Sequence, residues 1–179
     1  DVIEQCKQSL ATLYTARDQM DFLIEFFKLA KAQGIHTTID TAGNPFTREE
    51  PFFSKFNELM ALTDLFLLDI KQIDEQEHIK LTGHSNKNIL AMARELSDMK
   101  KPVWIRHVLV PGGSDKDEYL HRLADFIHTL SNVERVEVLP YHTLGKFKWE
   151  NLGLSYPLEG VNPPTQERID NARKILGAI

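Results

Sequence analysis

Helical and strand periods alternate along most of this chain of 179 residues, and that alternation limits its fold more than any other feature. From Met20 onward, amphipathic segments with a helical spacing are followed by short apolar segments that fit buried strands. Strands separated by helices are typical of a parallel sheet, because a parallel connection has to cross back over the sheet. The sequence therefore predicts an α/β fold, organised as one domain over residues 1–179, with strands at 35–40, 64–70, 103–110 and 133–139.

The helices between these strands are predicted from their apolar stripes and caps. The first helix has a stripe formed by Leu23, Phe26, Phe27 and Ala30. Thr47, followed three residues later by Glu50, predicts a capping box at the start of the second helix. Ser114 is the expected N-cap after the third strand, and Thr165 is the expected N-cap of the last helix. The segment 141–164, between the fourth strand and the last helix, is expected to be a long ordered loop.

Composition excludes several classes of function. The net charge of −5 is mixed along the chain, which argues against a basic surface for nucleic acid or for a membrane. We see no apolar run long enough to span a bilayer and no secretory signal after Asp1. The single cysteine, Cys6, excludes an internal disulfide, and its helical spacing favours a packed thiol over a metal ligand. We therefore expect a cytoplasmic protein.

The segment Asp64–Gln72 is an apolar run that ends abruptly in charged residues. Asp69 and Lys71 are two positions apart, so in a strand they project from the same face. Burying ionisable groups costs several kcal/mol unless they are paired or bind something. Two interpretations stay open for this pair: a binding site, or an internal ion pair that closes the end of a barrel.

Similar polar residues recur where each predicted strand ends, at intervals of roughly 30 to 37 residues, which is close to one βα unit. Because ligands of parallel sheets bind at the carboxyl ends of the strands, these positions predict one shared site. Taken singly, Arg106 is better explained as an internal partner of Asp69, and His142 is better explained as a loop residue that hydrogen-bonds the backbone. His107 lies on the opposite strand face and is expected to be packed. The candidate site consists of Asp40, Asp69, Lys71, Arg106 and His142.

The motifs that are missing limit the chemistry of this site. The sequence has no phosphate-binding G-x-x-x-x-G-K-[ST] loop, no G-x-S-x-G nucleophile elbow and no cysteine pairs at metal-ligand spacing. A zwitterionic ligand fits the residues that remain. Lys71, Arg106 and His142 are suited to a carboxylate or to hydroxyls, and Asp40 and Asp69 are suited to an amino group or a cation.

Seven dispersed blocks carry a family resemblance: Gly34–Thr41, Leu68–Gln72, Val103–Arg106, Val110–Gly112, Leu139–His142, Leu144–Lys146 and Lys148–Trp149. In this order they resemble the C-terminal two-thirds of the pyruvate formate-lyase activating enzymes, which belong to the radical S-adenosylmethionine superfamily. The similarity begins near Gln19 and continues to the end of the chain.

The resemblance implies a partial (β/α) barrel, related to the TIM barrel, in which S-adenosylmethionine lies beside a 4Fe–4S cluster. Its reductive cleavage gives a radical that removes a hydrogen atom from a glycine of pyruvate formate-lyase or another glycyl-radical enzyme. By the same resemblance, the cofactor is contacted at Asp69, Ile70, Lys71, Arg106, Val108 and His142. A monovalent cation is held by Asp40, Thr41, Asp69 and the backbone of Leu67.

Two motifs of that family are absent from this sequence: the cluster motif C-x-x-x-C-x-x-C and the Gly-Gly-Glu at the end of the second strand. Cys6 cannot replace three cluster ligands. We therefore expect a barrel truncated at its N-terminal strands, which binds no cluster and is inactive alone. Its edge strand from Ile35 is expected to be exposed unless residues 1–14 cover it or a second copy pairs there. The alternatives are a non-catalytic docking module and an aldolase-like enzyme that forms a Schiff base on Lys71.

Overall fold

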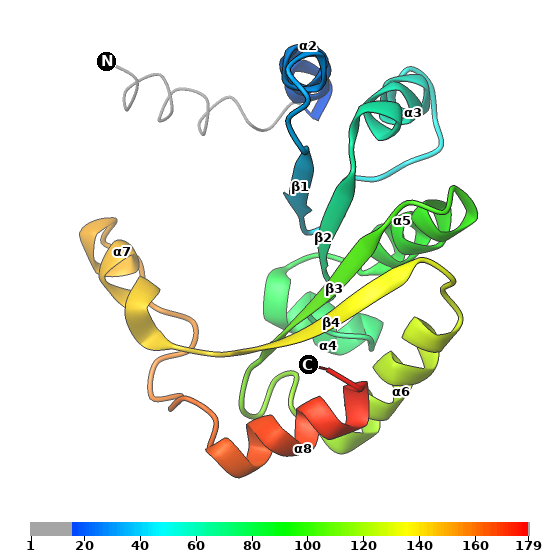
Figure 1. Cartoon of the computed structure of the whole chain (residues 1–179). Coiled ribbons are helices and arrows are strands. Elements are labelled where there is room, and N and C mark those ends of the chain that lie inside the picture. The colour runs from blue at the N-terminus through cyan, green and yellow to red at the C-terminus, as the bar shows by residue number, and fades with distance from the viewer. Residues whose placement is uncertain (1–15, 179) are drawn as a thin grey trace.

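A computed structural model describes residues 16–178 of the chain. As predicted, its sheet has four parallel strands, and their order is β1–β2–β3–β4 (Figure 1). The strands are β1 (Thr38–Thr41), β2 (Leu65–Asp69), β3 (Val103–Leu109) and β4 (Val133–Pro140). The first strand is shorter than predicted, because the amide of Ile35 bonds back to the carbonyl of Ala30 and ends the preceding helix.

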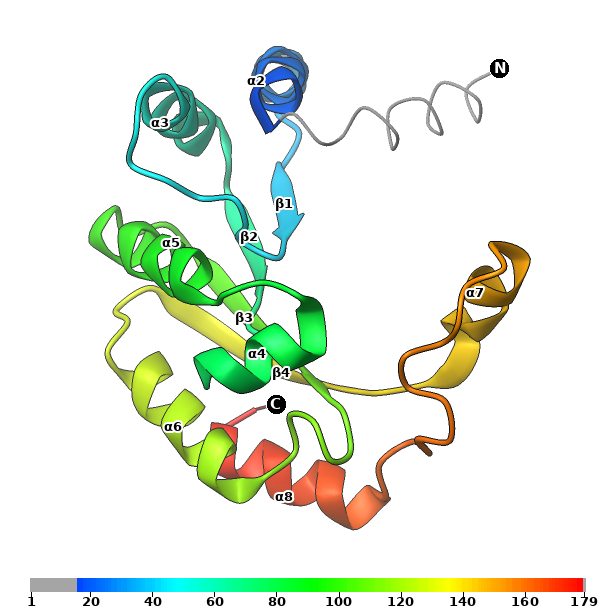
Figure 2. The same cartoon turned by 180° about the vertical axis from the view of Figure 1, so that it is seen from behind.

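Helices connect the strands, and most of them lie on one side of the sheet. They are α2 (Ala16–Ala32), α3 (Phe52–Leu62), α4 (Glu75–Thr82), α5 (Lys87–Asp98), α6 (Asp117–His128), the 3₁₀ turn η1 (Thr143–Gly145), α7 (Lys146–Asn151) and α8 (Gln166–Leu176). Figures 1 and 2 place α3, α4, α5, α6 and α8 on the same side of the sheet, while α7 projects beyond the end of β4. Among residues 16–178, none of the helices is both long and apolar enough to cross a membrane.

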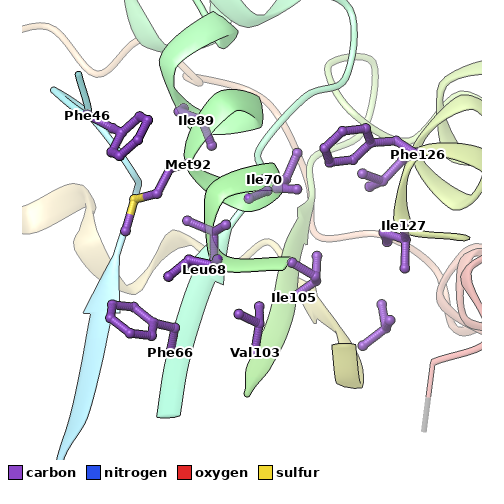
Figure 3. Packing of buried hydrophobic residues seen from close by; sticks show 14 of the residues in the cluster. Phe46, Phe66, Leu68, Ile70, Ile89, Met92, Val103, Ile105, Phe126 and Ile127 are labelled. Atoms are coloured by element: carbon purple, nitrogen blue, oxygen red, sulfur yellow. The ribbon is translucent and has the colours of Figure 1, made fainter. Parts of the chain in front are cut away.

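The core lies between the sheet and its layer of helices. In β3, buried and half-buried residues alternate strictly, as the two-residue period of a strand requires. Figure 3 shows the buried side chains of β2 and β3 gathered with those of α5 and α6. Phe66, Leu68 and Ile105 are fully buried there, and each contributes about 1.5–3 kcal/mol through burial. The opposite face of the sheet is only half-buried, and it carries Asp69 and Arg106.

Two predicted caps are wrong. The second helix begins at Phe52 rather than after Thr47, and its N-cap is Pro51, because a residue before proline is disfavoured in the helical region. Ser114 does not cap α6, whose N-cap is Lys116. Instead, the buried Ser114 hydroxyl accepts from the amide of Val110 and donates to the carbonyl of Val108. Of the predicted caps, that of α8 is confirmed: the hydroxyl of Thr165 accepts a hydrogen bond from the amide of Arg168.

Two other expectations are corrected by the packing. Among residues 20–32 of α2, the buried ones are Met20, Ile24 and Phe27, whereas Phe26 is 53% exposed and stacks on the exposed Phe22. The helix α2 packs against α3, and α3 covers only part of its surface. Some apolar residues of α2 therefore stay exposed. The predicted long loop 141–164 contains η1 and α7. The predicted helix around Cys6 and the covering of β1 by residues 1–14 lie outside the described residues.

Candidate functional site

Asp69 lies between two cationic side chains at the carboxyl end of β2. Asp69 and Arg106 are paired in the register of β2 and β3, and Arg106 Nε donates to Asp69 Oδ1 over 2.9 Å. Lys71 Nζ donates to the other oxygen, Oδ2, also over 2.9 Å. The side chains of Asp69 and Arg106 are only 14% and 18% exposed, so this ion pair is largely shielded from water. The network satisfies the charges that the sequence left unexplained.

Asp40 joins the same network from the neighbouring strand β1. Arg106 Nη2 donates to Asp40 Oδ1, so one guanidinium links two carboxylates that are distant in sequence. The side chain of Asp40 is 57% exposed at the edge of the sheet, so the network is accessible to solvent at this end. Four of the predicted side chains, Asp40, Asp69, Lys71 and Arg106, thus lie together. The binding-site and ion-pair interpretations are both compatible with this arrangement.

The remaining predicted residues surround this network or lie apart from it. Val108 is half-buried on the same face of β3 as Arg106, and Leu67 is the register partner of Asp40. The side chain of Ile70 is fully buried in the core, so only its backbone can contact a ligand on this face. His142 is exposed after the end of β4, and within residues 16–178 no hydrogen bond or ion pair joins it to the network.

The predicted cation ligands have suitable chemistry but are already engaged. Carboxylate, hydroxyl and carbonyl oxygens are the donors that hard cations prefer. However, Asp40 and Asp69 both accept from Arg106, and the hydroxyl of Thr41 accepts from the amide of Gly43 over 3.0 Å. In the described part of the chain, no three His, Cys, Asp or Glu side chains gather as a metal site. A cation bound at this position therefore shares both carboxylates with Arg106 or displaces it.

Two charged residues of β4 extend the polar face, and the sequence prediction missed them. Arg135 Nε lies 3.0 Å from Glu137 Oε1, and the Arg135 guanidinium lies 4.8 Å from the centre of the Trp104 ring. Glu137 is the register partner of Arg106. The signal was present in the alternation of charged and apolar residues from Arg135 to Val138, which is the pattern of a strand with one polar face.

His107 is packed on the other side of β3, as predicted. It is 2% exposed, and its ring nitrogens face the carbonyl oxygens of Ile70 and Ser114. Burial lowers the pKa of His107, and the backbone hydrogen bonds oppose that effect without cancelling it. The ring therefore lies on the face of β3 opposite to Arg106, where it contacts the backbone next to Lys71.

Comparison with curated proteins identifies close relatives, although no protein-family model matches the chain. The pyruvate formate-lyase-activating enzyme of Streptococcus mutans is 59% identical over 158 residues, which is 88% of this chain and 60% of that protein. The enzyme of the same name from Listeria monocytogenes is 54% identical over 158 residues, which is 88% of this chain and 64% of that protein.

Solved structures share the fold. A domain of pyruvate-formate lyase-activating enzyme from Bacteroides vulgatus superposes with a TM-score of 0.71 at 24% identity, over 89% of this chain and 86% of that chain. Coproporphyrinogen III oxidase from Escherichia coli, a radical SAM enzyme, superposes with a TM-score of 0.54 at 12% identity, over 84% of this chain and 34% of that chain. The four-stranded sheet thus shares the fold of these two proteins. Over 88% of its length the chain is similar to pyruvate formate-lyase-activating enzymes, and it spans 60% to 64% of the length of these two curated relatives.

Proposed function

We propose that this chain supplies part of the S-adenosylmethionine pocket of a pyruvate formate-lyase-activating enzyme. The observation that carries the proposal is the network in which Asp69 binds both Arg106 and Lys71 at the carboxyl ends of the strands. Ligands of parallel α/β folds bind at these ends, where the loops converge. The relatives are named for the activation of pyruvate formate-lyase, and that activity is what we propose for the complete protein.

Opposite charges in the network suit the zwitterionic end and the ribose of S-adenosylmethionine. Lys71 and Arg106 are placed to hold the carboxylate or hydroxyls of the ligand, and Asp69 is placed to accept from its amino group or hydroxyls. Val108 and the backbone of Ile70 would line the same end of the sheet. His142 would contribute from the loop after β4, provided that the ligand draws its exposed side chain inward.

The residues of this chain do not fit an iron–sulfur cluster. Such a cluster is held by cysteine thiolates, and the sequence contains one cysteine. We therefore propose that the chain binds S-adenosylmethionine weakly and does not generate a radical alone. A monovalent cation bound by Asp40, Thr41, Asp69 and the carbonyl of Leu67 is part of the same proposal. We also propose that the protein resides in the cytoplasm, with which a sequence that cannot form an internal disulfide is compatible.

A docking role is the second candidate, and the outer edge of β1 favours it. In the described residues β1 is at the end of the strand order, so its outer backbone groups face no neighbouring strand. Beside this edge, α2 exposes Phe22, Phe26 and Leu29 to 68%, 53% and 70%. Such an apolar strip beside an open strand edge is typical of an interaction surface. It suits a further βα unit, a glycyl-radical enzyme or a second copy of this chain.

The aldolase alternative receives no support from the geometry. A Schiff-base lysine needs a neutral amine that faces its carbonyl substrate. Lys71 Nζ instead donates to Asp69 Oδ2 in an ion pair, and its side chain is 34% exposed.

Titration of the chain with S-adenosylmethionine, followed by NMR chemical shifts, tests the first proposal. We expect saturable shifts at residues of the network, with a dissociation constant weaker than micromolar. Lys71→Met and Arg106→Met should abolish them. Lys80→Met is the matched control, because Lys80 is 71% exposed and pairs with Glu77 on α4. Equal binding by Lys71→Met and wild type would refute the assignment.

A further inference from the structure

Buried side chains join the two loops that leave the carboxyl ends of β2 and β3. His107, 2% exposed, reaches both: its Nδ1 lies 2.8 Å from the carbonyl oxygen of Ile70, and its Nε2 lies 3.2 Å from the carbonyl oxygen of Ser114. Ile70 directly precedes Lys71, and its amide donates to the carbonyl of Arg106 over 2.9 Å. The backbone on the N-terminal side of Lys71 is therefore fixed to β3 by two hydrogen bonds.

A second buried side chain fixes the backbone on the other side of Lys71. Gln72 is fully buried, and its Nε2 donates to the carbonyl of Gly113 over 2.9 Å. Its Oε1 accepts from the amide of Asp74 over 3.1 Å. Lys71 thus lies between Ile70, which is bonded to β3, and Gln72, which is bonded to the loop between β3 and α6. Its own side chain is 34% exposed, so its direction depends on the backbone from which it projects.

We propose that His107 is a positioning residue for Lys71. His107 holds the carbonyl of Ile70 through its Nδ1–H, and this bond keeps the side chain of Lys71 directed toward the polar face of the sheet. Gln72 is its counterpart on the following residue. The inference deepens the proposed function and rests on it for the identity of the ligand, S-adenosylmethionine. Positioning of this kind improves binding because less conformational freedom is lost when the ligand arrives.

The two contacts of His107 are not equivalent. A neutral imidazole carries one N–H, and we assign it to Nδ1 because that contact is the shorter. Burial lowers the pKa of His107, which favours the neutral ring. Two charged groups act on its pKa: Lys71 lowers it and Asp69 raises it. The bond to Ile70 is therefore the one that positions Lys71.

Amide substitutions separate the two contacts. The amide nitrogen of asparagine reaches the place of Nδ1, and that of glutamine reaches the place of Nε2. His107→Asn should keep the bond to Ile70, His107→Gln should lose it, and His107→Phe should lose both contacts. His78→Asn is the matched control, because His78 is another buried histidine, 2% exposed, whose Nδ1 lies 2.6 Å from a backbone carbonyl oxygen away from the site.

Two readouts decide the outcome at a temperature where every variant is folded: NMR hydrogen exchange of the Lys71 and Gln72 amides, and titration with S-adenosylmethionine. We expect His107→Gln and His107→Phe to accelerate exchange and weaken binding roughly five- to tenfold, as the loss of one buried hydrogen bond implies. His107→Asn and His78→Asn should stay within about twofold of wild type, by the same energetic scale.

Identical behaviour of His107→Asn and His107→Gln in both readouts would overturn the positioning role, and this comparison holds even where His107→Phe fails to fold. Normal binding by His107→Gln would overturn it as well. Should wild type bind no S-adenosylmethionine, the proposed ligand is wrong, while the exchange rates still decide whether His107 fixes Lys71. Gln72→Glu, which removes the donor to Gly113, is expected to accelerate exchange at the same two amides.

Discussion

Asp69 and Arg106 face each other across β2 and β3, and the guanidinium of Arg106 bridges Asp69 to Asp40 on the next strand. Because both charges of the Asp69–Arg106 pair are mostly shielded from water, each partner needs the other. Arg106, which we propose as a ligand-binding residue, is thus held by the carboxylates of Asp69 and Asp40 when no ligand is bound. A ligand carboxylate therefore competes with Asp40 and Asp69 for the N–H groups of this guanidinium.

Removal of Arg106 should destabilise the fold. Arg106→Met leaves the 14%-exposed Asp69 with Lys71 alone, and we expect the free energy of unfolding to fall by about 1–3 kcal/mol. Urea denaturation measures this change. Arg122→Met breaks the more exposed pair with Asp74 and should cost no more than about 1 kcal/mol. An Arg106 variant as stable as wild type would show that the network contributes nothing to folding.

Monovalent cations should stabilise the chain if Asp40 and Asp69 bind one. A ligand that binds only the folded state raises the melting temperature. We expect a higher melting temperature in potassium or sodium chloride than in choline chloride at the same ionic strength, and we expect Asp40→Asn to remove the difference. Equal melting temperatures of wild type in the three salts would exclude this cation site.

The pKa of His107 gives the stability a defined pH dependence. Burial lowers this pKa from its usual value of 6.5, so the unfolded chain binds the proton more readily than the folded chain. The contribution of His107 is therefore fully present above pH 6.5 and is lost as the pH falls from 6.5 toward the lower pKa of the folded state. Urea denaturation between pH 7.5 and 5.5 should show a steeper loss of stability for wild type than for His107→Asn. Parallel pH profiles of the two proteins would contradict this role of His107 in the pH dependence of stability.

The tyrosine pair beyond β4 offers a spectroscopic test of how residues 141–156 fold. Tyr141 and Tyr156 share a hydrogen bond of 2.7 Å between their hydroxyls, and this bond, with burial as the lesser cause, raises the pKa of Tyr141 to about 12. Tyr156→Phe should return this pKa toward its usual value of 10.0. Absorbance at the tyrosinate band during alkaline titration measures the shift. An unchanged titration curve would show that the two hydroxyls are not paired.

The two-residue period of a strand made much of this site predictable. It placed Asp69 and Lys71 on one face and His107 on the other, and the repeat of the βα unit brought in Arg106 and Asp40. These features depend on local geometry, which a sequence records directly. The position of His142 depends on the course of the loop after β4, and the sequence does not encode that course in a simple period.

The errors share a physical origin in the competition between local signals and neighbouring structure. Thr47 and Glu50 have the spacing of a capping box, but Pro51 moves the start of the helix. Ser114 has a preferred capping side chain, yet its hydroxyl satisfies two backbone groups of the preceding strand end. Phe26 belongs to an apolar stripe that α3 covers only in part. In each case a partner outside the local segment decides the outcome.

The last prediction concerns the iron–sulfur cluster and follows from its ligands. Because the sequence offers one cysteine, we expect the purified chain to remain colourless after anaerobic reconstitution with iron and sulfide. Fusion to the N-terminal portion of the Streptococcus mutans relative that this chain does not match should produce a brown protein and tighter binding of S-adenosylmethionine. Lys71→Met in the fusion should keep the colour and lose the tight binding, because Lys71 is proposed to bind S-adenosylmethionine and is not a ligand of the cluster. Micromolar binding by the unfused chain, abolished by Lys71→Met, would show instead that the network around Asp69 forms a sufficient site by itself.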